Sequence, residues 1–361
     1  MPVLSVSYVN YRNLKDGAMD LLSREVYFVG ENGQGKSNIL ESIYYSAYSS
    51  SFRTSRDAEI ARNGCGAFSV RTLYRDSNGS AHMLSTRYED GKKRVEKNGK
   101  SVKDRKELID TMPCVLFCHD DLAFVVGEPE RKRFFIDQCL SMYDVLYVDL
   151  KRRYQKILRS RNQVLREMKY DFLDVYDAQL AESGVRIQKK RNDALFKFNQ
   201  IFGRLYEDIA GIDGVSIKYD PSWRAERGAV PTKDEALRIL LQKRDADKAM
   251  QTSVSGVHRD RIAFFRGGEN FIPVASTGQR RLLAILLRVA QAVFYSQMAE
   301  KKPVLLMDDV LLELDPEKRR GVMGILPDYD QLFCTFLPGE PYELYRRSTT
   351  KVFTIKNGEW E

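Results

Sequence analysis

The sequence predicts a mixed α/β protein whose head is built from both ends of the chain, with an antiparallel β subdomain and an inserted helical subdomain. Three observations support this prediction. Short, wholly apolar strands are expected near both ends, at 26–29 and 304–307. Turn signals divide residues 67–100 into an antiparallel meander. From about 130 to 211, apolar residues recur at the three-, four- and seven-residue steps of amphipathic helices.

The elements of the N-terminal part follow from local patterns. Alternating apolar and polar side chains predict a strand at 3–9, and a glycine-bearing loop after the strand at 26–29 leads into a helix at 36–48. Another short strand is expected at 115–117. The turns of the meander are expected at Ser77-Asn78-Gly79, Asp90-Gly91 and Asn98-Gly99.

The middle of the chain is expected to hold two long amphipathic helices that pack as an antiparallel hairpin and end at 211–214. A loop rich in Pro, Gly and charge and one more helix follow. The expected elements after them are strands near 261–273, a helix at 277–298, a strand at 304–307, and closing strands at 331–336 and 352–355. We therefore expect three parts: 1–128 and 251–361 form the head, and 129–250 form the helical insert.

Composition limits the class of protein. The 361 residues are 43% hydrophobic and 30% charged, which excludes a disordered chain. No apolar run approaches the roughly 18 residues that a membrane span needs, and the N-terminus lacks the pattern of a secretion signal. The five cysteines are widely spread without zinc-site spacing, which indicates small buried side chains in a reducing cytosol. We expect a cytoplasmic protein.

The net charge of +8 is concentrated in two segments. Residues 131–169 hold eleven basic and four acidic side chains, a net of +7, and residues 92–106 hold eight basic and two acidic, a net of +6. The rest of the chain is slightly acidic. Basic charge gathered in this way favours a polyanionic partner such as nucleic acid, although solvated faces of a hairpin and a helix give the same pattern.

The loop after the strand at 26–29 matches G-x-x-x-x-G-K-[ST] at every fixed position. Its residues are Gly30, Glu31, Asn32, Gly33, Gln34, Gly35, Lys36 and Ser37. Glycines allow backbone N–H groups to curl around phosphate oxygens, and the helix N-terminus adds its positive dipole end. Lys36 is expected to bridge the β- and γ-phosphates, and the Ser37 hydroxyl to hold Mg²⁺. The loop predicts binding of a nucleoside triphosphate.

The strand at 304–307 ends in two carboxylates, Asp308 and Asp309. A buried parallel strand delivers its last residues to the phosphate edge of the sheet. Asp308 is therefore expected to assist Mg²⁺, directly or through water, and Asp309 to orient the attacking water. Asp309 is one methylene shorter than Glu, which predicts slow hydrolysis.

A second anion site is expected at the start of the helix at 277–298, where Ser276, Gly278 and Gln279 form a small, hydroxyl-bearing turn. One such turn is weak evidence, because capped helices commonly begin this way. Its position ahead of the carboxylate strand strengthens it. Phosphate loop, serine turn and carboxylate strand, in this order, resemble the ATP-binding-cassette (ABC) ATPases.

The whole chain resembles the RecF family of DNA-repair ATPases, relatives of the chromosome-maintenance (SMC) ATPases. The residues that carry the resemblance are 10–13, the loop 30–37, 51–53, the stretch GEPERKRFFID at 127–137, 256–260, 276–279, and 304–309 with 313–315 behind it. Within the last group, 313–315 resembles the family's D-loop, which couples two sites across a dimer.

The resemblance implies a cytoplasmic, nucleoid-associated ATPase with ATP and Mg²⁺ as cofactors. ATP would join two copies head to tail, the loop 30–37 of one facing Ser276, Gly278 and Gln279 of the other. The dimer would bind double-stranded or gapped DNA at gaps or junctions. It would hydrolyse ATP weakly, and DNA would stimulate this activity. With RecO and RecR partners it would help to load a RecA-type recombinase in repair, replication restart and the SOS response. Arg12 and Arg53 resemble arginines that related ATPases place near phosphate or DNA.

The expected DNA contacts in the helical insert are Lys151, Arg152, Arg153 and Lys156, with residues 92–106 as the alternative surface.

Some residues depart from the family pattern. Val257 stands in place of Pro. No Gln is found at the expected Q-loop, where His119 is the nearest candidate. No histidine occupies the switch position, where Thr335 is the nearest polar residue.

Two other functions stay open: the motor subunit of a transporter and a small-molecule kinase. The transporter is disfavoured by the basic insert, and the kinase does not explain the Ser276 turn.

Overall fold

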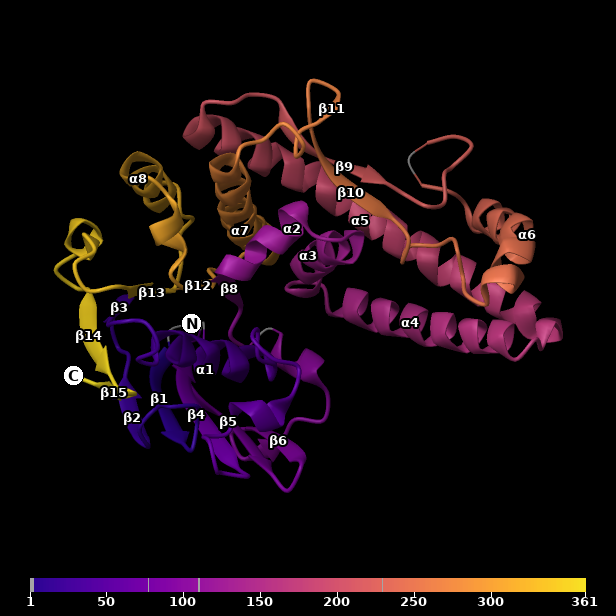
Figure 1. Cartoon of the computed structure of the whole chain (residues 1–361). Coiled ribbons are helices and arrows are strands. Elements are labelled where there is room, and N and C mark those ends of the chain that lie inside the picture. Colours follow the sequence, from indigo (N-terminus) through magenta and orange to yellow (C-terminus); the bar gives the residue numbers. More distant parts are fainter. Residues whose placement is uncertain (1–2, 77, 110, 229) are drawn as a thin grey trace. The chain divides into compact units, whose positions relative to one another are not determined.

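The computed structural model describes residues 3–361 except 77, 110 and 229, so Ser77 of the first expected turn lies outside the described residues. The chain divides into two compact units. The first, the head, contains the residues up to Asp121 and those from Leu287 onward, and the second, the arm unit, contains Leu122–Leu286. Figure 1 shows the elements of each unit along the chain.

The head contains a six-stranded sheet in the order β15-β14-β3-β13-β12-β8. All its strands are parallel except the short β15 at one edge. The strands are β3 (Glu25–Val29), β8 (Cys114–Phe117), β12 (Val304–Met307), β13 (Gln331–Phe336), β14 (Lys351–Lys356) and β15 (Glu359–Trp360). β3, β8, β12 and β13 are buried along their whole length, as parallel strands covered on both faces are. Their carboxyl ends therefore meet at one edge of the sheet.

A second, antiparallel sheet of the head has the order β2-β1-β4-β5-β6-β7. Its strands are β1 (Val3–Val9), β2 (Gly17–Asp20), β4 (Phe68–Arg75), β5 (Ala81–Glu89), β6 (Lys92–Lys97) and β7 (Lys100–Ser101). Asp90 and Gly91, and likewise Asn98 and Gly99, have the positive φ angles that two-residue hairpin turns require. The expected meander is present at these turns.

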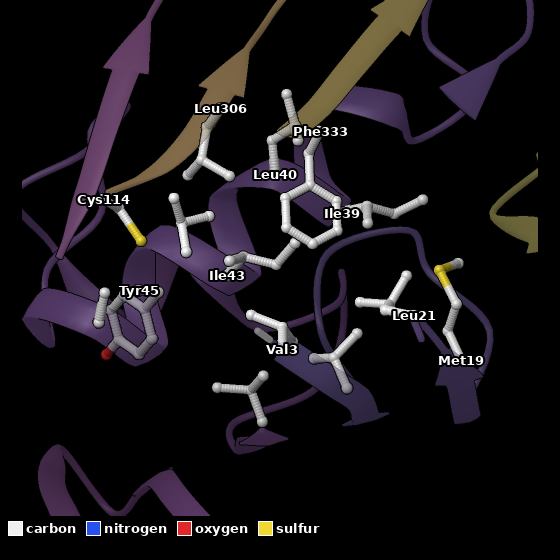
Figure 2. Close-up of a cluster of buried hydrophobic side chains, with 14 of the residues drawn as sticks. Val3, Met19, Leu21, Ile39, Leu40, Ile43, Tyr45, Cys114, Leu306 and Phe333 are labelled. Carbon is white, nitrogen blue, oxygen red and sulfur yellow. The ribbon is translucent and has the colours of Figure 1, made fainter. Parts of the chain in front are cut away.

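Helix α1 (Lys36–Tyr48) lies between the two sheets of the head. Figure 2 shows Ile39, Leu40 and Ile43 of α1 with Leu306 and Phe333 of the parallel sheet and with side chains from β1 and β2. All of these are fully buried. This core fixes the start of α1 against the strands whose ends form the candidate site.

The arm unit is mainly helical. It contains α2 (Ala123–Val126), α3 (Pro129–Ser141), α4 (Val145–Arg166), α5 (Leu173–Ala210) and α6 (Lys233–Met250). α4 and α5 pack along each other as the expected helical hairpin, and α5 ends at Gly211 with φ 65°. Short 3-10 helices occur in both units: η1 (Asp57–Ile60), η2 (Arg105–Leu108), η3 (His119–Leu122), η4 (Tyr170–Phe172), η5 (Val310–Glu313) and η6 (Tyr342–Tyr345).

The arm unit also contains a three-stranded sheet that the sequence did not predict as such. β9 (Val215–Asp220) pairs with β10 (Arg261–Arg266), which pairs with β11 (Glu269–Asn270). This pairing places residues 261–286 with the helices, so the limits of the two units differ from the expected boundaries after 128 and 250. The three-part division by motif stays a prediction.

Helix α7 (Thr277–Ala299) is long and apolar enough, by length and composition, to cross a membrane, but 72% of its most apolar stretch is buried inside the structure. Arg288 of this helix is buried and forms an ion pair with Asp121, 2.6 Å from Nη2 to Oδ1. A charged pair at mid-helix fits a helix of a protein core. The remaining helix, α8 (Pro316–Gly324), begins with Asp315 as its N-cap.

Candidate functional site

The loop 30–37 connects β3 to α1 at the carboxyl edge of the parallel sheet. Gly33 and Gly35 have φ angles of 78° and 119°, which disfavour any residue with a Cβ atom. Gly30 has a different constraint, because a Cβ there would lie 2.3 Å from the backbone oxygen of Ile355 in β14. The glycines of the motif are therefore required by backbone geometry and by packing.

Lys36 is the first residue of α1 and is only 3% exposed. Its ammonium donates to the backbone oxygens of Gly30, at 2.8 Å, and Glu31, at 3.3 Å. The Lys36 side chain thus folds back over the loop 30–37, and its positive charge faces the space that the loop backbone surrounds. This position suits an anion that the loop encloses.

Ser37 and Asp308 are brought together from distant parts of the chain. The Ser37 hydroxyl donates to Asp308 Oδ1 at 2.9 Å. Burial, aided by the nearby Asp309 charge, raises the pKa of Asp308 to about 6 despite the lowering effect of the Ser37 hydrogen bond. A hydroxyl and a carboxylate side by side are the oxygen donors that Mg²⁺ prefers.

Asp309 follows Asp308 in the left-handed conformation, with φ 53° and ψ 13°. Its backbone N–H donates to the hydroxyl oxygen of Thr335 at 2.8 Å. The Thr335 hydroxyl in turn lies 2.7 Å from Asp309 Oδ1 and 3.2 Å from Asp308 Oδ1. Thr335 belongs to β13, which lies between β3 and β12, so all three strands contribute to this edge.

A hollow at this edge is lined by residues of the loop and its surroundings: Asn32, Gly33, Gly35, Lys36, Ser37, Asn38, Arg53 and Asp309. A neighbouring hollow shares Asn38 and Arg53 and is also lined by Arg12, Asn13 and Arg62, among others. The hollow therefore brings together several expected residues of the phosphate loop and Asp309 of the carboxylate strand, and Asp308 adjoins it through its contact with Ser37.

Gln34 faces away from this space. Its side-chain oxygen accepts from the backbone N–H of Asn357 at 2.6 Å, and its backbone oxygen accepts from that of Gly358 at 2.9 Å. A Cβ on Gly358 would lie 1.9 Å from the backbone oxygen of Asn13. The turn between β14 and β15 thus supports the loop from behind, a role that no sequence signal marks.

Arg12 and Arg53 lie beside the loop but differ in how firmly they are held. Arg12 forms a two-pronged ion pair with the buried Glu41 of α1, at 2.8 and 2.6 Å. Arg53 is about half exposed and donates to Asn38 Oδ1 at 2.5 Å. Asn38 in turn donates to Asn13, which donates to the backbone oxygen of Gly33. This chain of contacts links Arg53 to the phosphate loop.

Glu340, in the loop after β13, is close enough for its charge to interact with those of Lys36 and Asp309, which the sequence did not reveal. Burial raises the pKa of its carboxyl, the negative charge of Asp309 raises it further, and the positive charges of Arg319 and Lys36 lower it. Its Oε1 is buried and has no hydrogen-bond partner in the described part of the chain. The loop after β13 carries no motif, so only the fold identifies it.

Ser276, Gly278 and Gln279 lie in the arm unit, at the start of α7. Ser276 and Gln279 form a reciprocal cap, in which the Ser276 N–H donates to Gln279 Oε1 at 2.7 Å and the Gln279 N–H donates to Ser276 Oγ at 3.2 Å. Gly278 is exposed. Within one chain these residues therefore act as a helix cap on an exposed turn.

The four expected DNA contacts on α4 are not equivalent. Arg152, Arg153 and Lys156 are exposed, whereas Lys151 is half-buried and forms an ion pair with Asp137. Arg153 and Lys156 form no ion pair with any described residue. Lys151 is thus engaged inside the arm unit, and the exposed positions are the better candidates for contact with a phosphate backbone.

Asp137 belongs to a buried polar cluster that explains two of the resembling stretches. Arg191 of α5 is fully buried and donates to Asp137 at 2.9 and 3.0 Å and to Asp260 at 2.8 Å. Burial raises the pKa of Asp137, but the charges of Arg191 and Lys151 outweigh it and lower the value to about 2. These contacts tie α3, α5 and the 256–260 loop together.

His258 has a structural position in the same loop. Its Nε2 lies 3.1 Å from the backbone oxygen of Ser253, and its Nδ1 lies 2.8 Å from the Tyr154 hydroxyl. Because a carbonyl only accepts, Nε2 carries the proton and Nδ1 accepts from Tyr154. Burial lowers the pKa of His258 to about 4, so the ring is neutral at neutral pH. His119 is exposed and Val257 is buried.

Comparison with known proteins decides the family. A family model described as the RecF/RecN/SMC N terminal domain matches residues 3–360. The DNA replication and repair protein RecF of Treponema pallidum (strain Nichols) is 46% identical over 352 residues, which cover 97% of this chain and 98% of that protein. The chain belongs to the RecF family. The family assignment made from the motifs is confirmed.

Solved structures agree with this assignment. The recombination mediator protein RecF-ATP in the RecFOR pathway superposes with a TM-score of 0.88 at 26% identity, over 99% of this chain and 96% of that one. A Smc head domain with an extended coiled coil from Pyrococcus furiosus gives 0.58 at 16% identity, over 99% and 95%, and shows the fold alone. The predicted fold, an ABC-type ATPase head with an antiparallel β subdomain and a helical insert, is confirmed.

Proposed function

We propose that the chain binds ATP with Mg²⁺ in the hollow at the carboxyl edge of the parallel sheet. The observation that carries this proposal is the convergence of Lys36 and Ser37, at the start of α1, with Asp309, just after β12, around one open space, together with the contact of Ser37 with Asp308. The loop N–H groups and the Lys36 ammonium would hold the β- and γ-phosphates. The neighbouring hollow beside Arg12 and Arg62 is the space proposed for the rest of the nucleotide.

The residues present fit a magnesium ion. Mg²⁺ in phosphate-transfer sites usually takes one or two protein ligands and completes its octahedron with water and phosphate oxygens. Ser37 Oγ and Asp308 Oδ1 supply two such oxygens, 2.9 Å apart. The ion would neutralise charge that develops on the phosphates.

Hydrolysis would then depend on the residues of the chain that face the γ-phosphate. Asp309 is proposed to orient the attacking water, and Lys36 to stabilise the charge of the transferred phosphoryl group. The short Asp309 side chain supports weak rather than rapid turnover. We also propose that DNA stimulates ATP hydrolysis by this protein.

The function also requires a second copy of the chain. Ser276, Gly278 and Gln279 form an exposed turn at a helix N-terminus, which is suited to reach phosphate held by another subunit. We propose that ATP joins two copies head to tail through this turn. Family membership supports this arrangement over a transporter motor or a small-molecule kinase.

DNA is the proposed partner of the ATP-bound dimer. The exposed Arg152, Arg153 and Lys156 of α4 supply positive charge, and the hairpin of β6 and β7 is the alternative surface. The similar ATP-bound protein is a recombination mediator of the RecFOR pathway. This likeness supports a cytoplasmic, nucleoid-associated role at gaps or junctions, in which RecO- and RecR-type partners help to load a RecA-type recombinase.

The mass of the protein in solution tests the ATP-dependent step. Wild type is expected to be monomeric without nucleotide and dimeric with ATP and Mg²⁺, by sedimentation or light scattering. Lys36→Ala removes the ammonium that faces the phosphates, so it should stay monomeric and show no ATP binding by calorimetry. A wild-type protein that binds no ATP, or that binds ATP and stays monomeric, would contradict the proposal.

A further inference from the structure

Thr335 occupies a position in the site that neither the phosphate loop nor the carboxylate strand accounts for. It is the fifth residue of β13 and is only 3% exposed. β13 lies between the strand that leads to the phosphate loop and the strand that ends in the two carboxylates. We propose that Thr335 is a positioning residue that fixes the conformation of Asp309 for the reaction.

The first contact is with the backbone. Asp309 adopts φ 53°, a left-handed conformation that residues with a Cβ atom adopt rarely. Its N–H, turned by this conformation toward β13, donates to Thr335 Oγ1 at 2.8 Å. The threonine hydroxyl therefore satisfies the backbone group that the unusual turn would otherwise leave without a partner.

The second contact is with the carboxylate. A hydroxyl has one hydrogen, and Asp309 Oδ1 lies closer to it, at 2.7 Å, than Asp308 Oδ1, at 3.2 Å. The Thr335 hydroxyl therefore donates to Asp309 Oδ1 as the nearer acceptor, while Asp308 Oδ1 accepts from Ser37. Thr335 thus holds Asp309 at two points, its backbone nitrogen and one carboxylate oxygen.

The result is a carboxylate with one oxygen held and one available. Asp309 Oδ2 has no hydrogen-bond partner among the described residues, and Asp309 lines the hollow that Lys36 and Ser37 also line. Rotation of the carboxylate away from the hollow would break its contact with the Thr335 hydroxyl. We therefore expect Thr335 to raise the fraction of molecules in which the Asp309 carboxylate faces the attacking water of the proposed hydrolysis. Thr335 itself would not contact the nucleotide.

This inference rests on the proposed ATPase activity, and matched variants separate the two. Thr335→Val keeps the shape and removes both contacts, while Thr335→Ser keeps the hydroxyl. Thr72→Val is the control, because Thr72 is a fully buried threonine of β4 whose hydroxyl bonds to Ser46, outside the loop and the carboxylate strand. The readouts are kcat and KM for ATP, and calorimetric affinity for a non-hydrolysable ATP analogue with Mg²⁺.

Thr335→Val is expected to lower kcat by about tenfold to a hundredfold, as small displacements of catalytic groups do. Its KM and its analogue affinity should stay within about threefold of wild type, since ground-state binding is untouched. Thr335→Ser and Thr72→Val should keep the wild-type kcat. Equal losses of kcat in the Val and Ser variants, an unchanged kcat in Thr335→Val, or a loss of analogue affinity that parallels kcat would overturn the positioning role. Absence of ATP binding by wild type would instead overturn the proposed function.

Discussion

The Ser37 hydroxyl donates to Asp308 Oδ1 over 2.9 Å, although 271 residues separate the two in the chain. The contact exists because β3 and β12 are both neighbours of β13, so their carboxyl ends reach the same edge. Two short motifs, one near each end of the chain, thereby form a single site. Substitutions at either motif should therefore affect the same nucleotide-dependent steps.

Asp308→Asn should weaken the magnesium-dependent part of ATP binding. The amide keeps the size of the side chain and loses the charge, so the affinity gained by adding Mg²⁺ should fall by about tenfold or more. ATP affinity in EDTA should change little, because the loop and Lys36 are intact. Calorimetric titrations with and without Mg²⁺ measure this, and an equal response to Mg²⁺ in both proteins would contradict the role of Asp308.

Ser276→Arg should block ATP-dependent dimerisation and leave ATP binding to the monomer intact. The substitution also removes the cap of α7, worth about 1 kcal/mol. Thr232→Ala is a matched control, because Thr232 caps α6 through the same reciprocal contact with Glu235. Sedimentation with ATP should show monomer for Ser276→Arg and dimer for Thr232→Ala. Monomer in both would assign the effect to lost stability.

Replacing Arg153 and Lys156 together by Gln should weaken DNA binding and flatten its salt dependence. Each lost phosphate contact lowers the slope of log K against log salt by about 0.9, so the two substitutions should lower it by about 2 for each protomer that contacts DNA and by about 4 for the dimer. Lys92 and Arg94 of β6, replaced in the same way, give a double variant of equal charge. If only this second variant flattens the slope, the DNA surface is the hairpin and not α4.

Acidification from about pH 6.5 to about 4 should destabilise the protein through His258. Above this range the imidazole is neutral in both the folded and the unfolded chain. Within this range, the unfolded chain takes up a proton that burial denies to the folded protein. The free energy of unfolding therefore decreases as the pH is lowered. His258→Gln should lower this pH dependence, while His119→Gln, at an exposed position, should keep it. Denaturant unfolding at several pH values decides between them.

The fold could be predicted where the signal is local. The helix at 36–48 and the strands at 3–9, 304–307 and 331–336 match the structure because each has its own pattern of apolar residues or its own flanking loop. The sequence does not predict β9, because Val215–Asp220 follows Gly211 and Gly214 and gains its strand character from pairing with β10. Pairing between distant segments leaves little trace in a short sequence window.

The site shows the same contrast. Lys36, Ser37 and Asp308 were found because their neighbours in sequence form motifs. Thr335 was noted only for its closeness to the switch position, and Glu340 had no signal, since an isolated Thr or Glu near the end of a strand has no distinctive surroundings until the sheet is assembled. The position of Lys151 could not be foreseen either, because a run of basic residues on a helix does not reveal which member meets Asp137.

DNA binding by wild type and Lys36→Ala, with and without ATP across a salt series, tests the central claim most directly. Wild type with ATP should bind duplex DNA more tightly and with a steeper salt dependence than wild type alone, because the dimer doubles the phosphate contacts. Lys36→Ala should behave like nucleotide-free wild type under both conditions. Equal DNA binding by the two proteins in the presence of ATP would contradict an ATP-controlled DNA-binding function.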